Sequence, residues 1–301
     1  MATLYTHKDS NIRKTFLLFT VFLVFVIGVG WIFAQVYGNS LILYVAVAFS
    51  LIMNVLAYWY SDKIVLKMAR AKEISKKDYR ELYNIVENLS ITAGLPTPKI
   101  YLVDEVQPNA FATGRDPEHG VVAVTRGLLE RLDRSELEGV IAHELSHIGN
   151  RDMLISTVAV VLVGFISILS DIFMRSMLWG GLGRRDSRDS GGQVMFLIGI
   201  AASILAPIGA VLMQLAISRK REFLADASGA LLTRHPEGLA LALEKISSDQ
   251  TPMKKAASST TAHLWLSSPF RGRKGTPWFA KMFMTHPPTH DRTKALRGMD
   301  V

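Results

Sequence analysis

The chain has 301 residues, a net charge of +8, a mean hydropathy of +0.23 and no cysteine. The absence of cysteine excludes disulfides and thiolate ligands, so any metal must be bound by histidine and carboxylate side chains. The apolar bulk, and the lack of a basic stretch interleaved with aromatic residues, argue against a soluble nucleic-acid-binding protein.

The first predicted elements are two membrane-spanning helices. No charged residue occurs between Thr15 and Ser61, and a helix needs about 20 apolar residues to cross the hydrocarbon core. We therefore predict spans at about 16–36 and 41–60, within a hairpin that comprises residues 1–61. The first span is too long for the apolar region of a cleaved signal peptide, and a second span follows it at once.

Basic residues flank this hairpin at both ends, whereas its turn carries no charge. Positively charged segments stay on the cytoplasmic side of a membrane, so we expect both ends of the hairpin to face the cytoplasm. The basic residues are Lys8, Arg13 and Lys14 before it, and Lys63, Lys67, Arg70, Lys72, Lys76, Lys77 and Arg80 after it.

A mixed α/β portion is predicted for residues 62–152. Apolar residues at helical spacing predict one amphipathic helix over 62–89. Three short strands are expected next, at 99–103, 106–113 and 120–125.

A second hydrophobic hairpin is predicted over residues 153–218, with spans at about 153–174 and 193–217. Whether these spans cross fully or form a re-entrant hairpin stays open, because their connecting loop contains arginines. In either case Asp152 and Arg219 are expected on the same side of the membrane.

A metal-binding motif lies on the helix before this second hairpin, whose start we assign to a capping box of Ser135 and Glu138. His143, Glu144 and His147 fit the pattern H-E-x-x-H. Histidines four residues apart share a helix face and can bind one ion, and Glu144 can reach a water in the fourth coordination position. The alternative is a surface helix with two unrelated histidines, which the capped start and the apolar flanks disfavour.

A third ligand is predicted in the segment SRKREFLAD, which opens a helical portion over 219–301. Glu222 can bind the metal, while Asp226, on the same helix face, can hydrogen-bond the far nitrogen of a ligand histidine. The alternative is a charged helix in which Glu222 pairs with a basic neighbour such as Arg219. The metal site is favoured because HELSH and SRKREFLAD flank opposite ends of one hairpin and so meet at one membrane face.

Together, HELSH, SRKREFLAD and THPPTHDR resemble the HtpX family of bacterial integral-membrane zinc metalloproteases, grouped as gluzincins with the CAAX prenyl protease and the mitochondrial inner-membrane stress protease. The resemblance covers nearly the whole chain. It implies a membrane α-helical fold with four hydrophobic segments plus a mixed α+β zinc metalloprotease domain of gluzincin type. One Zn²⁺ per subunit would be held by His143, His147 and Glu222, with Glu144 as general base and acid.

The resemblance also implies a biological setting. It is that of a multi-pass protein of the bacterial cytoplasmic (inner) membrane with its active site facing the cytoplasm. Its partners would be the lipid bilayer and misfolded membrane protein substrates, with no nucleic acid, in proteolytic quality control and stress response.

Further site residues follow from the resemblance. His286 matches a position suited to stabilising an oxyanion, and Arg292 matches one that structures the site. Asn109, Ala110 and Phe111 resemble a stretch along the cleft, where an edge strand can pair with an extended substrate. The alternatives are a turn histidine before two prolines and an ordinary strand. The remaining histidines lack ligand spacing and are predicted at the surface or in loops: His7, His119, His235, His263 and His290.

Two other classes of protein compete with this interpretation. An intramembrane protease would bury the motif in hydrocarbon, but the predicted helix begins among six charged residues between positions 130 and 138. A non-enzymatic membrane scaffold or chaperone with a structural zinc would need four protein ligands, and the sequence offers three.

Overall fold

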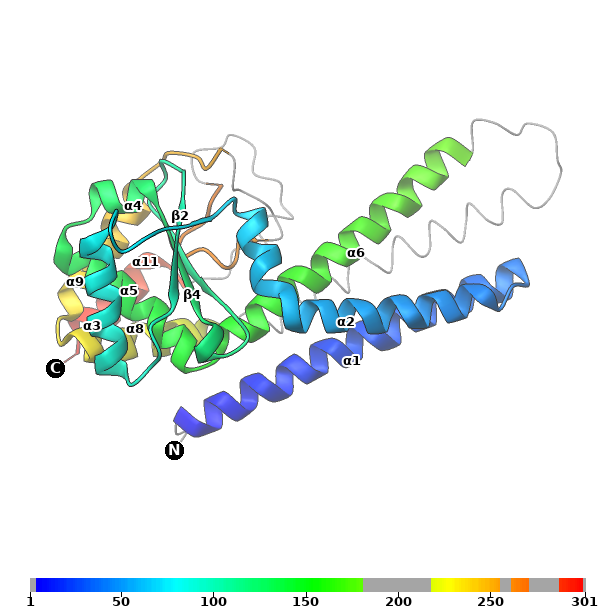
Figure 1. Cartoon of the computed structure of the whole chain (residues 1–301), viewed down its shortest axis with the longest axis horizontal. Coiled ribbons are helices and arrows are strands. Elements are labelled where there is room, and N and C mark those ends of the chain that lie inside the picture. Colours follow the sequence, from blue (N-terminus) through cyan, green and yellow to red (C-terminus); the bar gives the residue numbers. More distant parts are fainter. Residues whose placement is uncertain (1–3, 181–217, 255–260, 271–286, 300–301) are drawn as a thin grey trace.

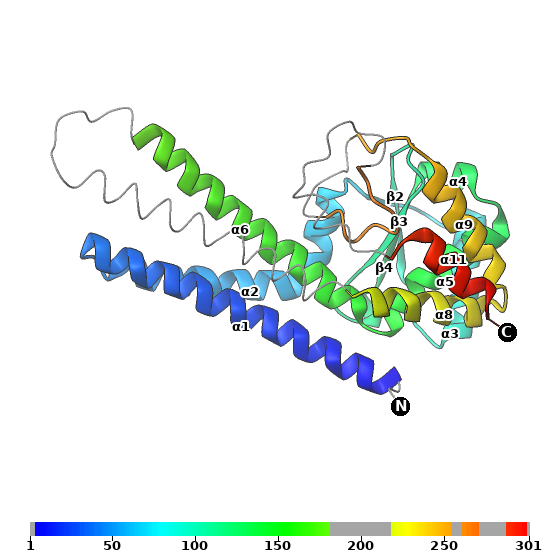
Figure 2. The same cartoon turned by 180° about the vertical axis from the view of Figure 1, so that it is seen from behind.

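The computed structural model describes residues 4–180, 218–254, 261–270 and 287–299. Three long helices project from one side of an α/β domain (Figures 1 and 2). The N-terminal end of the first helix lies near that domain. The three helices are α1 (Leu4–Tyr37), α2 (Leu41–Met68) and α6 (Asp152–Gly180).

The two spans predicted for the first hairpin are confirmed as helices long and apolar enough to cross a membrane, over Ser10–Gln35 and Leu41–Met68. Their outward side chains remain exposed, including Phe16 at 67%, Tyr44 at 67% and Trp31 at 52%. A protein surrounded by water rarely exposes so many large apolar groups together. These surfaces therefore face lipid.

The first half of α6 packs against both of the other long helices. Val158 and Leu162 are fully buried there, in one apolar cluster with Leu18 and Phe22 of α1 and Ala57 of α2. The span predicted at 153–174 lies within α6, whereas the span predicted at 193–217 lies outside the described residues.

The α/β domain is built on a four-stranded sheet in the order β1-β2-β4-β3. Central β2 and β4 run parallel, while β1 and β3 are antiparallel to their neighbours. All five residues of β4 are buried, as expected for a strand covered on both faces. The strands are β1 (Lys72–Glu73), β2 (Lys99–Val103), β3 (Ala110–Thr113) and β4 (Val121–Thr125).

The prediction of a single helix over 62–89 is wrong. The chain leaves α2 after Met68, where Arg70 adopts a left-handed φ of 53°. It then forms β1, whose Lys72 lies opposite Leu102 of β2, and only afterwards enters α3 (Arg80–Ala93). The helical spacing continued across this break because the segment contains neither glycine nor proline. The strand predicted at 106–113 is also shorter than expected, since β3 begins at Ala110.

Helix α5 (Arg134–Gly149) is the centre of the domain and contacts β3, α3, α8 and α9. Its helical neighbours come from both sides of the second hydrophobic segment in the sequence, and Figure 2 shows α8, α9 and α11 gathered around it. The remaining elements are α4 (Arg126–Arg131), α8 (Arg219–Thr233), α9 (Pro236–Ser248), α11 (Thr289–Arg297) and the short 3₁₀ helix η1 (Pro117–His119).

The predicted capping box of α5 is displaced by two residues. Asp133 is the N-cap, and its Oδ1 accepts a hydrogen bond from the backbone N–H of Glu136 at 3.0 Å. Glu136 Oε2 in turn accepts one from the backbone N–H of Asp133 at 2.9 Å. Both registers have an acid three residues on, and Ser135 instead donates its hydroxyl to Asp133.

Candidate metal centre

Helix α5 presents the two predicted histidine ligands on its buried face. His143 is 1% exposed and His147 is partly buried, and their Nε2 atoms lie 3.1 Å apart. Residues four apart on a helix are neighbours on one face, so the spacing alone brings both imidazoles together. Glu144 is 2% exposed and lines the same pocket.

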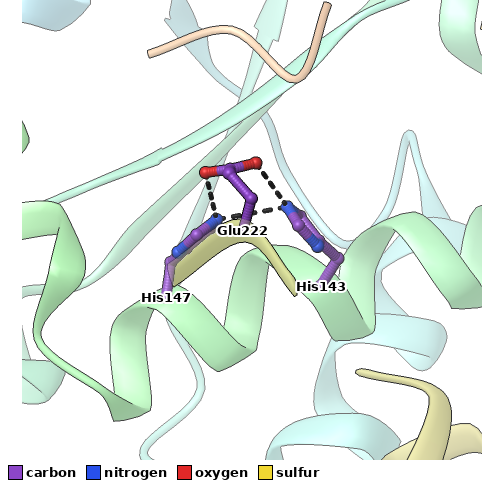
Figure 3. Close-up of side chains that lie close together, drawn as sticks. All are labelled: His143, His147 and Glu222. Atoms are coloured by element: carbon purple, nitrogen blue, oxygen red, sulfur yellow. Dashed lines mark hydrogen bonds and ion pairs between the residues drawn. The ribbon is translucent and has the colours of Figure 1, made fainter. Parts of the chain in front are cut away.

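Helix α8 supplies the third predicted ligand, as Figure 3 shows. The Glu222 carboxylate lies 3.7 Å from His147 Nε2 and 3.9 Å from His143 Nε2. This approach requires Gly229, because a Cβ at that position would lie 2.9 Å from the backbone nitrogen of His143. The glycine therefore lets α8 cross α5 closely enough to bring Glu222 over the two rings.

The donor set fits a zinc ion. One ligand atom from each of His143, His147 and Glu222 lies within 4.8 Å of the others. Two nitrogens bound at about 2.0–2.1 Å to a tetrahedral ion lie about 3.3–3.4 Å apart, close to the 3.1 Å between the two Nε2 atoms. Two imidazoles and a carboxylate are also a ligand combination of catalytic zinc sites.

Each histidine has a carboxylate at its far nitrogen. His143 Nδ1 lies 2.9 Å from Asp226 Oδ1, and His147 Nδ1 lies 3.2 Å from Asp152 Oδ2. A carboxylate at Nδ1 keeps the proton there and leaves the lone pair on Nε2 for a metal. This arrangement suits the tautomer in which Nε2 of each histidine binds a metal.

Asp226 is itself held by Arg292 of α11. The guanidinium donates two hydrogen bonds to the carboxylate, at 2.8 and 2.6 Å, and Arg292 is 2% exposed. Burial alone would raise the pKa of Asp226, but Arg292, together with His143, lowers it to about 2. The carboxylate is therefore charged, and the structure places both predicted supporting residues beside the ligands.

The carboxylates beside His147 raise the pKa of its imidazole. Burial alone would lower the pKa of His147, but the hydrogen bond to Asp152 and the charge of Glu222 raise it to about 9. The metal-free site thus holds a proton at neutral pH, which a metal must displace in order to bind.

The predicted substrate strand is the edge strand of the sheet and lies next to the site, but the chain itself covers its start. Ala110 is fully buried, and its carbonyl oxygen accepts a hydrogen bond from the backbone N–H of Leu266 at 2.9 Å. The Asn109 carboxamide exchanges two hydrogen bonds with the backbone of Ser267, at 2.7 and 3.0 Å. Phe111 packs edge-on against Trp265, with ring centroids 4.7 Å apart. The chain's own segment 264–268 therefore runs along β3.

The predicted site residue His286 lies outside the described residues. Sequence reasoning also missed several residues of the site. His263 was predicted at the surface or in a loop; it lies in a loop but is buried, at 7% exposed, and it lines the pocket with Glu144. Asp152 and Arg221 also line it. Asp152 was interpreted only as the edge of a hydrophobic segment, and Arg221 only as part of the motif SRKREFLAD. An acid in the first turn of an apolar helix was the available signal for Asp152, because ionisable groups there are usually functional.

A helix bearing H-E-x-x-H, completed by a glutamate from a second helix beside a hydrophobic hairpin, defines the class of membrane-attached metallopeptidases. Comparison with known proteins agrees with this class. Peptidase family M48 matches residues 76–300. The chain is 45% identical to a protein named Protease HtpX homolog from Caldanaerobacter subterraneus subsp. tengcongensis, and 46% identical to one from Thermoanaerobacter pseudethanolicus. Both alignments cover 99% of each chain.

The chain belongs to peptidase family M48, among its HtpX-type membrane proteases. Among solved structures, that of S. mikatae Ste24p matches with a TM-score of 0.50 and 18% identity. The match covers 94% of this chain and 65% of that one, and it shows the fold alone.

Proposed function

We propose that this protease is a zinc-dependent endopeptidase of the bacterial cytoplasmic membrane. Its substrates are misfolded or damaged membrane proteins, which it cleaves in proteolytic quality control and the stress response. The observation that carries the proposal is the convergence of His143, His147 and Glu222 beside the buried Glu144. The alternative scaffold with a structural zinc would need a fourth protein ligand, and the metal-ligand cluster found among the described residues has three members.

Each residue has a defined task in this proposal. One zinc ion per subunit, when bound, polarises the scissile carbonyl and acidifies the attacking water. Glu144 takes the proton from that water and delivers it to the leaving amine. Asp226 and Asp152 keep the two histidines in the ligand tautomer, and Arg292 holds Asp226. His286 is assigned to oxyanion stabilisation by its sequence match alone.

The proposed setting is a multi-pass protein with four hydrophobic segments and its active site facing the cytoplasm. Asn11, near the start of the first span, contacts the site through Asp152. The metal centre therefore lies close to the membrane boundary, on the side that the basic flanks assign to the cytoplasm.

We assign substrate binding to Asn109, Ala110 and Phe111, through backbone pairing with an extended peptide. The Ala110 carbonyl is already bonded to Leu266. An extended substrate therefore pairs with β3 at this point only after segment 264–268 has moved away.

The test is cleavage of a destabilised membrane protein by detergent-purified chain, stripped with a chelator and then reloaded with zinc. Glu144→Gln should retain stoichiometric zinc and lose about 10²–10⁴-fold in turnover, because it removes the general base. Glu138→Gln is the matched control, since Glu138 lies on the same helix in an exposed ion pair with Arg134, and it should cleave normally. An active, zinc-loaded Glu144→Gln protein, or a wild type that binds zinc and cleaves nothing, would refute the assignment.

A further inference from the structure

One polar residue of the first membrane helix reaches the metal centre. Asn11 of α1 is 3% exposed, although it lies within the apolar span Ser10–Gln35. Its Nδ2 donates to Asp152 Oδ1 at 2.7 Å and to the backbone oxygen of Asn150 at 3.2 Å. Its Oδ1 accepts a hydrogen bond from Arg221 at 3.3 Å. Both donors of the carboxamide and its acceptor are thus used.

These bonds fix the orientation of Asp152. The side chain of Asp152 is 5% exposed, and a buried carboxylate is stable only when hydrogen bonds replace its hydration. Asn11 binds one of its oxygens, Oδ1, and Arg221 Nε lies 3.7 Å from the same atom. The other oxygen, Oδ2, is left to face His147 Nδ1 at 3.2 Å.

We propose that Asn11 is a positioning residue of the metal centre, through which the first membrane helix orients His147 by way of Asp152. This inference rests on the metal site proposed above. The first membrane helix is then part of the site, because the contacts from Asn11 to Asp152 and from Asp152 to His147 orient the ligand nitrogen towards the ion. Outer partners of ligand histidines typically change metal affinity by about 10–100-fold.

The experiment measures the zinc dissociation constant of the full-length, detergent-purified chain by competition with a chromophoric chelator. Asn11→Leu keeps the branched shape and the number of side-chain heavy atoms but removes all three hydrogen bonds, and it should weaken zinc binding by about 10–100-fold. Asn54→Leu is the matched control, because Asn54 of α2 donates to the backbone of Phe19 in α1 at 3.3 Å, away from the site. It should leave the dissociation constant unchanged.

Two further readouts separate positioning from general stability. The visible spectrum of the Co²⁺-substituted protein should change in Asn11→Leu and not in Asn54→Leu. If Asn11 acts through Asp152, its effect on zinc affinity should largely disappear when Asp152→Ala is already present, because residues in one network are not additive. A full effect of Asn11→Leu in that background would overturn the proposal.

The inference fails if Asn11→Leu lowers only the unfolding midpoint of the metal-free protein and binds zinc as tightly as wild type. Should Asn11→Leu not fold, the smaller Asn11→Ser removes the carboxamide without adding volume, and wild-type affinity in that variant overturns the proposal equally. A wild type that binds no zinc would instead refute the proposed function, so the two failures are distinguishable.

Discussion

The two sides of the metal centre are built alike but from different parts of the molecule. On one side, His143 contacts Asp226, which is clamped by Arg292, and all three lie on helices of the α/β domain. On the other, His147 contacts Asp152, which is bonded to Asn11 of the first membrane helix. One ligand is thus oriented by the protease domain and the other by the membrane hairpin.

The difference shows why the hairpin is more than an anchor. The Asp226–Arg292 contact is a bidentate ion pair, the strongest common form of charge-assisted hydrogen bond. Asp152 instead receives a neutral carboxamide donor and a guanidinium whose Nε is 3.7 Å away. We expect the His143 side to be the more rigid one, and the His147 side to respond to displacement of α1.

The largest expected loss of stability comes from replacing Arg292. In Arg292→Met the Asp226 carboxylate stays buried without its partner, and breaking a buried ion pair in this way costs about 3–5 kcal/mol. Thermal and chemical unfolding of the metal-free protein in detergent would measure it. Arg297→Met is the control on the same helix, since the ion pairs of Arg297 with Glu237 and Glu244 are exposed. Equal stability losses in the two variants would contradict the assigned role of the buried pair.

A smaller effect should appear in the stability of chelator-treated protein, where the two sides should give opposite pH dependences. The pKa of Asp226 is lowered from 3.8 to about 2. Its contribution to the free energy of unfolding is therefore present above pH 3.8 and is lost as the pH falls towards 2. The pKa of His147 is raised from 6.5 to about 9, so its contribution is present below pH 6.5 and is lost as the pH rises to 9. At about 1.4 kcal/mol per pKa unit, the two losses are about 2.5 kcal/mol for Asp226 and about 3.5 kcal/mol for His147.

The free energy of unfolding, measured by chemical denaturation across this pH range, would show both limbs. His147→Gln should remove the alkaline limb and keep the acid one, because the glutamine side chain does not titrate. An alkaline limb that persists in His147→Gln would have to come from another group and would refute the assignment.

Sequence reasoning located the His143 side more fully than the His147 side. The motif spacing gives His143 and His147 directly, and helix periodicity places Asp226 four residues after Glu222 on the same face. Asp152 and Asn11 carry no such local pattern, since their meeting depends on how α1 and α6 pack. The same limit explains β3, whose edge is covered by a segment more than 150 residues away in the sequence.

In the two other errors, a structure that the sequence pattern also allowed was the more stable one. The break after α2 is stabilised by pairing between β1 and β2, a non-local gain that outweighs the continuous helical pattern of 62–89. The cap of α5 was placed at Ser135 because two overlapping registers offer the same spacing. The aspartate two residues earlier accepts the backbone hydrogen bond instead.

The smallest predicted effect tests how the two ligand-bearing helices approach each other. Gly229 of α8 faces the backbone of His143, and the Cβ of Gly229→Ala would lie 2.9 Å from the His143 nitrogen. Because backbone cannot rotate away as a flexible side chain does, α8 must shift by several tenths of an ångström, and overpacking of this kind costs about 1–3 kcal/mol. Glu222 would move with it, so zinc affinity should fall together with stability.

Gly149→Ala is the matched control on α5, because its added Cβ would meet only Leu95 at an ordinary 3.6 Å. Zinc competition and thermal unfolding of the two variants would measure the difference. Equal losses of zinc affinity in Gly229→Ala and Gly149→Ala would show that the close crossing of α8 over α5 does not position Glu222.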